Sequence, residues 1–271
     1  FWHLCGAANL AQSPEANRQG RFTVGKRQLD ADGFVAEALK AFDEAVSLME
    51  IEVPEAGRSL IQGWLGFFTA WKGRRVAGFD EPRELAAKLI ADSFAAALVP
   101  GLCGACKGVD LGSGNGWPGL ALKALELCGH VSLLDSRAGA CEFLRGFVES
   151  TRLSGVEVLQ ERAEQAGQDE GFRERYTLAV SRAMAAPGIA LELCSGLVAP
   201  GGKVVLWVGP EQEVPRSGPG LDAIGLKLKT EIPYTLPWDM GSRLLAVYNK
   251  VQPLDRKYPR RYAAIRKKPL I

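Results

Sequence analysis

The chain has 271 residues, of which 47% are hydrophobic and 24% are charged, an ordinary composition for a soluble globular protein. This length fits one large α/β domain with an appendage, or two small domains. No apolar run reaches the roughly 18–20 residues that a membrane-spanning helix needs. We recognise no cationic signal peptide, and six cysteines do not make a disulfide scaffold in a chain of this length, so we expect a cytoplasmic protein.

The net charge of +2 is unevenly distributed. From residue 250 onward the chain has eight Lys or Arg and one Asp, so the remainder is net acidic. A basic tail over residues 251–271 on a mildly acidic body indicates a polyanionic partner. The alternative is a solvated, partly disordered tail.

The N-terminal part of the chain divides into two segments. Residues 1–28 are mixed and aperiodic, and we expect them to be poorly ordered. In residues 29–100 apolar side chains recur at helical spacing, which predicts a helical extension. Its three helices cover residues 34–49, 54–71 and 82–98, the last two opened by prolines. Aromatic residues at this spacing are typical of a core face rather than of a base-stacking surface.

The most informative motif is Asp110-Leu-Gly-Ser-Gly-Asn-Gly-Trp-Pro-Gly119. A short strand ends at Asp110, and a helix follows the glycine-rich turn, as in α/β proteins that bind a nucleotide-like ligand. The spacing of Gly114, Gly116 and Gly119 also fits the dinucleotide fingerprint, a weak signal by itself. A third possibility is that these glycines, with Gly112, serve only a tight turn.

Two carboxylates favour S-adenosylmethionine over a dinucleotide. Asp110 would repel a pyrophosphate, but it suits a ligand that carries a sulfonium and an ammonium. The next predicted strand ends at Asp135, and a carboxylate at that place can accept hydrogen bonds from both ribose hydroxyls.

Strands and helices alternate over residues 101–250. The predicted strands cover residues 108–110, 131–135, 156–159, 176–180, 203–208, 226–233 and 243–249. The predicted helices between them cover residues 120–127, 137–153 and 187–198. This order implies a mostly parallel, seven-stranded sheet with a terminal antiparallel pair, and such sheets bind ligands at the carboxyl ends of their strands.

Two further segments fall at that edge. Ala163 and Glu164 can contact an adenine, although a polar turn that caps a helix explains them equally well. Ser181-Arg-Ala-Met184 lacks both the Pro-Pro-aromatic motif of amine methyltransferases and a Pro-Cys nucleophile. The missing motifs argue against methylation of an exocyclic amine and against methylation of a cytosine carbon. Acceptor atoms that are already nucleophilic remain. Arg182 can hold a carboxylate or orient the acceptor, and the alternative is a surface charge.

A combination of short motifs resembles the bacterial small-subunit (16S) ribosomal RNA guanine-N(7) methyltransferases, the glucose-inhibited division protein B family. The matching pieces are Asp110–Gly119, Leu133–Ser136, Phe143–Arg145, Arg162–Glu164, Ser181–Ala183, Pro200–Gly202, Lys257–Arg261 and Pro269–Leu270. The resemblance covers the chain from about residue 54 to the end. It implies a Rossmann-like α/β fold of class I, S-adenosylmethionine as cofactor, and ribosomal RNA or the assembling small subunit as partner.

The resemblance also implies roles for particular residues. The cofactor-binding positions would be Gly112, Trp117, Ala163, Glu164 and Arg182, with Asp135 on the ribose and Asp110, Gly114 and Gly116 in the same loop. The RNA-binding positions in the basic tail would be Lys257, Arg260, Arg261, Arg266, Lys267 and Lys268. Guanidinium groups such as those of Arg260 and Arg261 bind phosphate bidentately. We expect a monomer.

Guanine N(7) carries an in-plane lone pair and no proton, so methylation needs in-line placement and no general base. A site without a catalytic His or Cys therefore suffices, with Arg182 as the orienting residue. The chain departs from the family at Val76–Gly78, Leu89, Val208, Ala263 and Ile265. These departures leave a catalytically impaired RNA-binding protein, or a small-molecule enzyme of the same fold, as the alternative.

Cys103 and Cys106 form the one Cys-x-x-Cys pair of the chain. A structural zinc site needs four ligands, and the sequence has no second cysteine or histidine pair to complete one. We therefore expect ordinary thiols and no metal.

Overall fold

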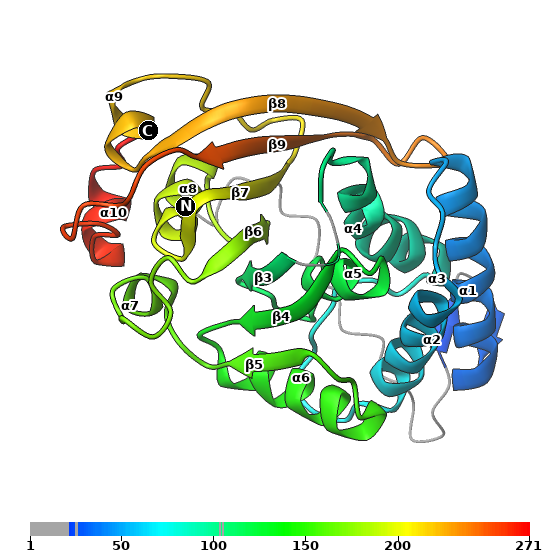
Figure 1. The fold of residues 1–271 in the computed structure, drawn as a ribbon. Coiled ribbons are helices and arrows are strands. Elements are labelled where there is room, and N and C mark those ends of the chain that lie inside the picture. Colours follow the sequence, from blue (N-terminus) through cyan, green and yellow to red (C-terminus); the bar gives the residue numbers. More distant parts are fainter. Residues whose placement is uncertain (1–21, 25–26, 103, 105) are drawn as a thin grey trace.

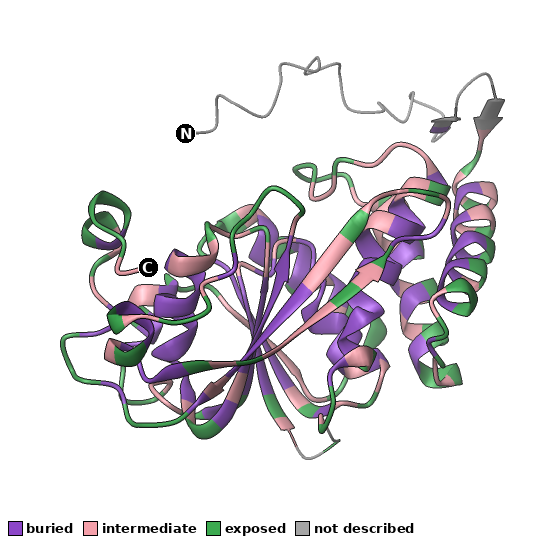
Figure 2. Ribbon diagram, turned by 90° about the horizontal axis from the view of Figure 1, so that it is seen from above, coloured by how far each residue is buried: buried purple, intermediate pink, exposed green. Residues whose placement is uncertain are grey.

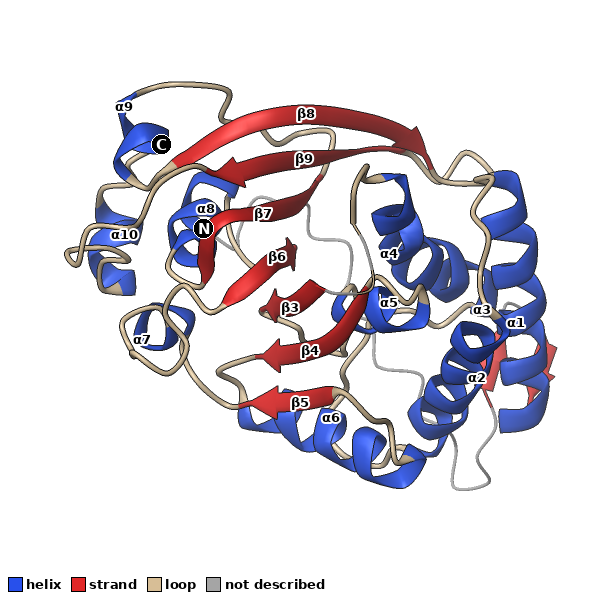
Figure 3. Cartoon of the chain, viewed as in Figure 1, coloured by secondary structure: helices blue, strands red, loops and turns tan. Residues whose placement is uncertain are grey.

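The computed structural model describes residues 22–24, 27–102, 104 and 106–271. A seven-stranded sheet in the order β5-β4-β3-β6-β7-β9-β8 runs through the middle of the molecule (Figures 1 and 3). Its strands are β3 (Cys106–Leu111), β4 (Cys128–Leu134), β5 (Val156–Leu159), β6 (Tyr176–Arg182), β7 (Val198–Val208), β8 (Leu226–Thr235) and β9 (Ser242–Lys250). Strands β3 to β7 are parallel, and β9 is antiparallel to β7 and β8, which confirms the predicted sheet.

Helices cover both faces of the sheet, so the protein has two hydrophobic cores (Figure 2). Alternate residues of a strand point to opposite faces, and in β7 Val205 and Trp207 enter one core while Val204 and Leu206 enter the other. The first core contains α1 (Ala31–Leu48), α2 (Glu55–Ala70), α5 (Gly119–Ala124) and α6 (Ala138–Thr151). The second contains α7 (Ala163–Ala166), α8 (Pro187–Ser195), α9 (Pro219–Ala223) and α10 (Tyr262–Lys267).

The predicted helical extension is part of the first core. Asp30 caps α1 by accepting a hydrogen bond from the Gly33 amide at 2.8 Å, and α2 begins directly after Pro54, as predicted. At Gly57 of α2 a Cβ atom would lie 2.2 Å from the carbonyl oxygen of Ala124, so only glycine allows α2 to approach α5 this closely. None of the helices in the described part of the chain is long and apolar enough to span a membrane.

The third predicted helix is not uniform. Residues 82–98 form α3 (Pro82–Glu84), a π-helical segment η1 (Leu85–Ala91), α4 (Asp92–Phe94) and a 3-10 turn η2 (Ala95–Leu98). The Asp92 amide donates to the Ala87 carbonyl five residues back, and the Leu89 carbonyl accepts instead from the Arg182 guanidinium and the Ser93 hydroxyl. A distant guanidinium and a nearby hydroxyl thus replace a regular α-helical bond at Leu89. Short π-helical segments of this kind are frequent at functional sites.

The prediction that residues 1–28 are poorly ordered is wrong for the part that the structure describes. Strands β1 (Phe22–Val24) and β2 (Arg27–Leu29) pair antiparallel. The Phe22 ring packs on Phe34 of α1, with 4.7 Å between ring centroids, which gives the hairpin an apolar contact that the aperiodic sequence did not reveal. The rest of residues 1–28 lies outside the described residues.

The basic tail is anchored to the domain, contrary to the alternative of a solvated, partly disordered tail. The Arg173 guanidinium donates to the carbonyl oxygens of Leu254, Asp255 and Tyr258, and to that of Gly167, at 2.7–3.1 Å. Ile265 of α10 is fully buried in the second core. Arg173 therefore holds the start of the tail against the loop after α7.

Replacing Arg173 by Ala should lower the free energy of unfolding by about 2–3 kcal/mol, because several partly buried carbonyl groups lose a charged donor. Urea unfolding measures this change. Arg175→Ala is the matched control, since Arg175 is exposed and makes one long hydrogen bond, of 3.4 Å, to the Glu170 carbonyl. Equal effects of the two substitutions would contradict the role of Arg173.

Candidate cofactor and acceptor cleft

The loops that follow β3, β4, β5 and β6 meet at the carboxyl edge of the sheet, as predicted, and enclose a cleft in two halves. One half, with a volume of about 340 Å³, is lined by Asp135, Ala163, Glu164 and Tyr262 among others; we call it the Asp135 half. The other, of about 710 Å³, is lined by residues that include Trp117 and Arg182; we call it the Trp117 half. Both halves are bordered by Gly112, Arg137 and Ala183, so they lie next to each other.

The glycine loop has backbone geometry that side chains would disturb. Gly112, Gly114 and Gly116 have φ angles of +72°, +57° and +101°. A Cβ atom at Gly112 would lie 2.7 Å from Cγ of Met184, and one at Gly116 would lie 2.6 Å from Cδ1 of Leu120. Gly112 and Gly114 line the cleft, whereas Gly116 is among the lining residues of neither half and serves helix packing instead.

The prediction that Asp110 faces a cationic ligand is wrong. Its side chain is fully buried, and Oδ2 accepts a hydrogen bond from the Gly119 amide at 2.8 Å, which fixes the end of the loop at the start of α5. Oδ1 has no hydrogen-bond partner among the described residues. Burial raises the pKa of Asp110 to about 7, although the Gly119 amide and Arg182 oppose the rise.

Asp135 lies where the sequence placed it, at the end of β4 and in the wall of the cleft. Its Oδ2 accepts from the Gly114 amide at 2.9 Å, and its Oδ1 accepts from the Arg137 amide at 2.8 Å. The Arg137 guanidinium binds both oxygens, at 3.1 and 3.2 Å. Burial alone would raise the pKa of Asp135, but the hydrogen bonds from Arg137 and Gly114 outweigh it, so the pKa is lowered and the carboxylate is ionised at neutral pH.

Two large side chains of the Trp117 half, those of Trp117 and Arg182, contact residues behind the cleft wall. The Trp117 ring packs edge-on against Trp64 of α2 at 5.7 Å. The Arg182 guanidinium binds Oδ2 of Asp92 and the Leu89 carbonyl, each at 2.9 Å. Arg182 thus faces the cleft, as predicted, but its charge is already compensated by Asp92.

Sequence reasoning missed the cluster around Asp92. The Tyr234 hydroxyl donates to Oδ1 of Asp92 at 2.6 Å, and the Trp207 indole donates to the Asp92 carbonyl at 2.8 Å. Burial and the neighbouring carboxylate raise the pKa of Tyr234 above its ordinary range. The partners of Asp92 are distant in the chain, so no local pattern in the sequence indicates this cluster.

The helix-capping interpretation of Ala163 and Glu164 is confirmed, while contact with an adenine stays a prediction. They begin the short helix α7, and they line the Asp135 half. Glu164 accepts a hydrogen bond from Arg162 at 2.8 Å. Tyr262 of α10 borders the same half, a contribution from the tail that the sequence did not predict.

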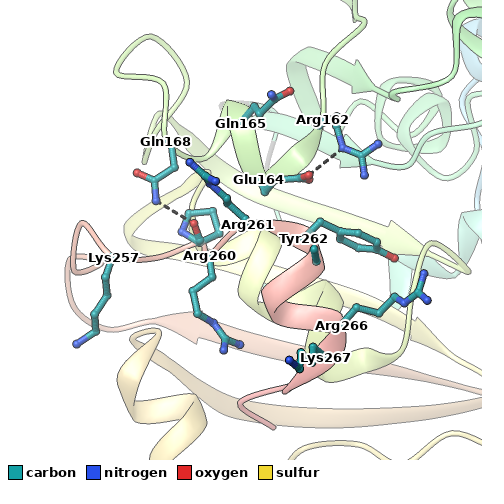
Figure 4. Close-up of a pocket in the computed structure, with 12 residues that line it drawn as sticks. Arg162, Glu164, Gln165, Gln168, Lys257, Arg260, Arg261, Tyr262, Arg266 and Lys267 are labelled. Atoms are coloured by element: carbon teal, nitrogen blue, oxygen red, sulfur yellow. Dashed lines mark hydrogen bonds and ion pairs between the residues drawn. The ribbon is translucent and has the colours of Figure 1, made fainter.

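A groove of about 1280 Å³ adjoins the cleft, because Arg162, Glu164 and Tyr262 line both. Figure 4 shows Arg162 and Glu164 across from α10. We call it the basic groove. The predicted RNA-binding residues that line it are Lys257, Arg260, Arg261, Arg266 and Lys267. Lys268 is exposed but is not among the lining residues.

Arg260 departs from its predicted role. Its Nε and Nη2 bind the carboxylate of Glu192, which is fully buried on α8, at 2.9 and 2.7 Å, and its Nη1 binds the Lys268 carbonyl. Arg260 therefore anchors the tail, and its guanidinium is not free to bind a phosphate with two hydrogen bonds. Arg261, Arg266 and Lys267 are exposed, whereas Lys257 is paired with Asp255 at 3.1 Å.

The remaining predicted features are placed as follows. Cys103 lies outside the described residues, and Cys106 is half-buried with a free thiol. Among the residues that the structure describes, no three His, Cys, Asp or Glu come together as a metal site.

Three of the positions where the chain departs from the family, Val76, Leu89 and Val208, line the Trp117 half.

The family model of GidB, described as rRNA small subunit methyltransferase G, matches residues 69–214. The chain belongs to this family. A relative named ribosomal RNA small subunit methyltransferase G from Carboxydothermus hydrogenoformans is 37% identical over 164 residues, 60% of this chain and 70% of the relative. A relative of the same name from Rubrobacter xylanophilus is 32% identical over 241 residues, 86% of this chain and 91% of the relative.

Solved structures resemble the chain only distantly. An rRNA methylase from Streptococcus thermophilus is 20% identical, covers 60% of this chain and 95% of its own, and gives a TM-score of 0.40, too low to bear on function.

Membership of the GidB family confirms the resemblance drawn from the motifs, and S-adenosylmethionine is the methyl donor. The cleft fits this cofactor: Gly112 and Gly114 line it without side chains, and the ionised carboxylate of Asp135 lies in the same wall.

Replacing Asp110 by Asn should change how stability depends on pH. The pKa of Asp110 is raised in the folded protein from an ordinary 3.8 to about 7, so ionisation disfavours the fold progressively as the pH rises between these values. We expect the unaltered protein to lose stability relative to Asp110→Asn from about pH 4 to pH 7, and no further above it. Urea unfolding across this range measures the difference. A constant difference would contradict the buried, raised pKa.

Proposed function

We propose that this protein transfers the methyl group of S-adenosylmethionine to N(7) of a guanine in small-subunit (16S) ribosomal RNA. The observation that carries the proposal is the lining of the Trp117 half, next to the glycine loop. Its described lining residues include no His or Cys, and its one carboxylate, Asp92, is bound to Arg182 and Tyr234. Such a cavity suits an acceptor that needs no general base.

The proposed mechanism depends on placement. The cofactor supplies an electrophilic methyl group on its sulfonium. Asp135 accepts hydrogen bonds from the ribose, while Gly112 and Gly114 allow the backbone to approach the ligand. Arg182, held by Asp92, orients the guanine, and the buried Trp117 ring limits water in the cleft. No general base would be needed, because the lone pair of N(7) would form the N–CH3 bond as the S–CH3 bond breaks and S-adenosylhomocysteine leaves.

The basic groove supports RNA as the partner. Arg261, Arg266 and Lys267 are exposed along it, and it lies next to the cofactor cleft, since Tyr262 lines both. Phosphate contacts by such cations supply affinity without reading sequence. We propose that the protein acts as a monomer in the cytoplasm, on naked RNA or on the assembling small subunit.

A second candidate function rests on the departures from the family. Because Val76, Leu89 and Val208 all line the Trp117 half, they change the cavity that would receive the acceptor. An RNA-binding protein with impaired catalysis, or an enzyme that methylates a small molecule, is therefore the alternative.

Ribosomal RNA from a strain without this protein should lack one N(7)-methylguanine in the small subunit, and the unaltered gene should restore it. Mass mapping of RNA fragments measures the change. Asp135→Ala should fail to restore it and should weaken S-adenosylmethionine binding at least about tenfold in calorimetry, the effect expected from losing charged hydrogen bonds. An unchanged methylation pattern, with RNA binding intact, would favour the alternative.

Alanine at Arg261, Arg266 and Lys267 together should weaken RNA binding and reduce the slope of log K against log salt by about 2, since each phosphate contact contributes roughly 0.7–0.9. Filter binding over a range of salt concentrations measures the slope. The charge-matched control replaces Lys40, Lys227 and Lys229, which are exposed and lie outside the groove. If both triple variants give the same slope, the groove does not bind RNA.

A further inference from the structure

The Arg137 side chain lies across the middle of the cleft. It borders both halves, and its Nη2 atom lies 3.3 Å from where a Cβ atom would stand on Gly114. Its guanidinium bonds in the structure go to Asp135 alone, and the side chain is 70% exposed. Arg137 is thus tied to the cleft wall by one carboxylate.

A ribose and the Arg137 guanidinium need the same acceptors. Each oxygen of Asp135 accepts from one backbone amide, Gly114 or Arg137, which the loop and the start of α6 hold in place. The guanidinium takes the remaining capacity of both oxygens. Ribose hydroxyls that donate to Asp135 must therefore replace the guanidinium. This step rests on the cofactor site proposed above.

The other cations of the Trp117 half have partners that the cofactor would not displace. Arg182 is bound by Asp92, and Lys88 forms an ion pair with Glu84 at 2.6 Å. Arg243 donates to the Ser242 carbonyl and lies 4.0 Å from Asp92. Arg137 is the cation in this lining whose side-chain bonds compete directly with the ribose.

We propose that cofactor binding releases Arg137 from Asp135 and that the freed guanidinium then binds an RNA phosphate beside the acceptor, so that the two ligands bind cooperatively. Guanidinium binds phosphate well, and the exposed side chain is free to turn toward the mouth of the Trp117 half. Because coupling between two ligands is reciprocal, RNA would tighten cofactor binding by the same factor.

The experiment measures binding without turnover. Unmethylated small-subunit ribosomal RNA is titrated into the full chain with and without S-adenosylhomocysteine, which cannot donate a methyl group. We expect this ligand to tighten RNA binding about fivefold or more, within the usual range of coupling factors. In Arg137→Ala the tightening should disappear, and S-adenosylhomocysteine alone should bind more tightly because its competitor is gone.

Arg145→Ala is the matched control, since Arg145 is an exposed arginine of α6 that binds Gln160 and lines neither half. It should keep both the coupling and the cofactor affinity. In the unaltered protein the bound cofactor should also steepen the salt slope of RNA binding by roughly 0.7–0.9, one phosphate contact.

Three results would overturn the inference. Equal coupling in Arg137→Ala and in the unaltered protein would show that another group carries it. If Arg137→Ala binds S-adenosylhomocysteine more tightly but this ligand does not tighten RNA binding in the unaltered protein, Arg137 competes with the ribose only. If the unaltered protein binds no S-adenosylhomocysteine, both the proposed function and the inference about Arg137 fail. The first two results contradict the inference alone and leave the proposed function standing.

Discussion

The arrangement of the cleft depends on one buried carboxylate, that of Asp92. It sits at the junction of η1 and α4 and bonds to Arg182 of β6 and to Tyr234 of β8, while its carbonyl accepts from Trp207 of β7. A buried charge is tolerable only when its hydrogen bonds and its counter-charge are in place, and removing one partner typically destabilises a protein by about 3–5 kcal/mol. The contacts of Asp92 therefore fix the position of the helical extension relative to β6, β7 and β8 at the carboxyl edge of the sheet.

This junction also explains why the third helix is irregular. The Leu89 carbonyl is directed to Arg182, and the chain passes through a π-helical segment before Asp92. The same helix supplies Leu89 and Lys88 to the lining of the Trp117 half. The residues around this junction thus stabilise the fold and also form part of the cleft wall.

The sequence predicted the features that depend on local pattern. Alternating elements predicted the sheet, and the ends of the strands predicted the places of Asp135 and Glu164. It misplaced Asp110, because a carboxylate at a strand end can face either a ligand or the following helix, and here it bonds to Gly119. It misjudged Arg260, whose partner Glu192 is distant in the chain and buried on α8. Pairings between distant segments leave no periodic trace in a single sequence.

The shared core of the extension and the sheet has a consequence for the substrate. Since Trp64 of α2 packs against Trp117 in a continuous apolar core, the wall of the acceptor cavity is rigid. In an A-form helix N(7) lies in a deep, narrow major groove that side chains do not enter. If the proposed reaction is correct, the RNA and not the protein has to change shape, and a guanine in a loop or bulge, which needs little unstacking, is selected over one in a stacked duplex.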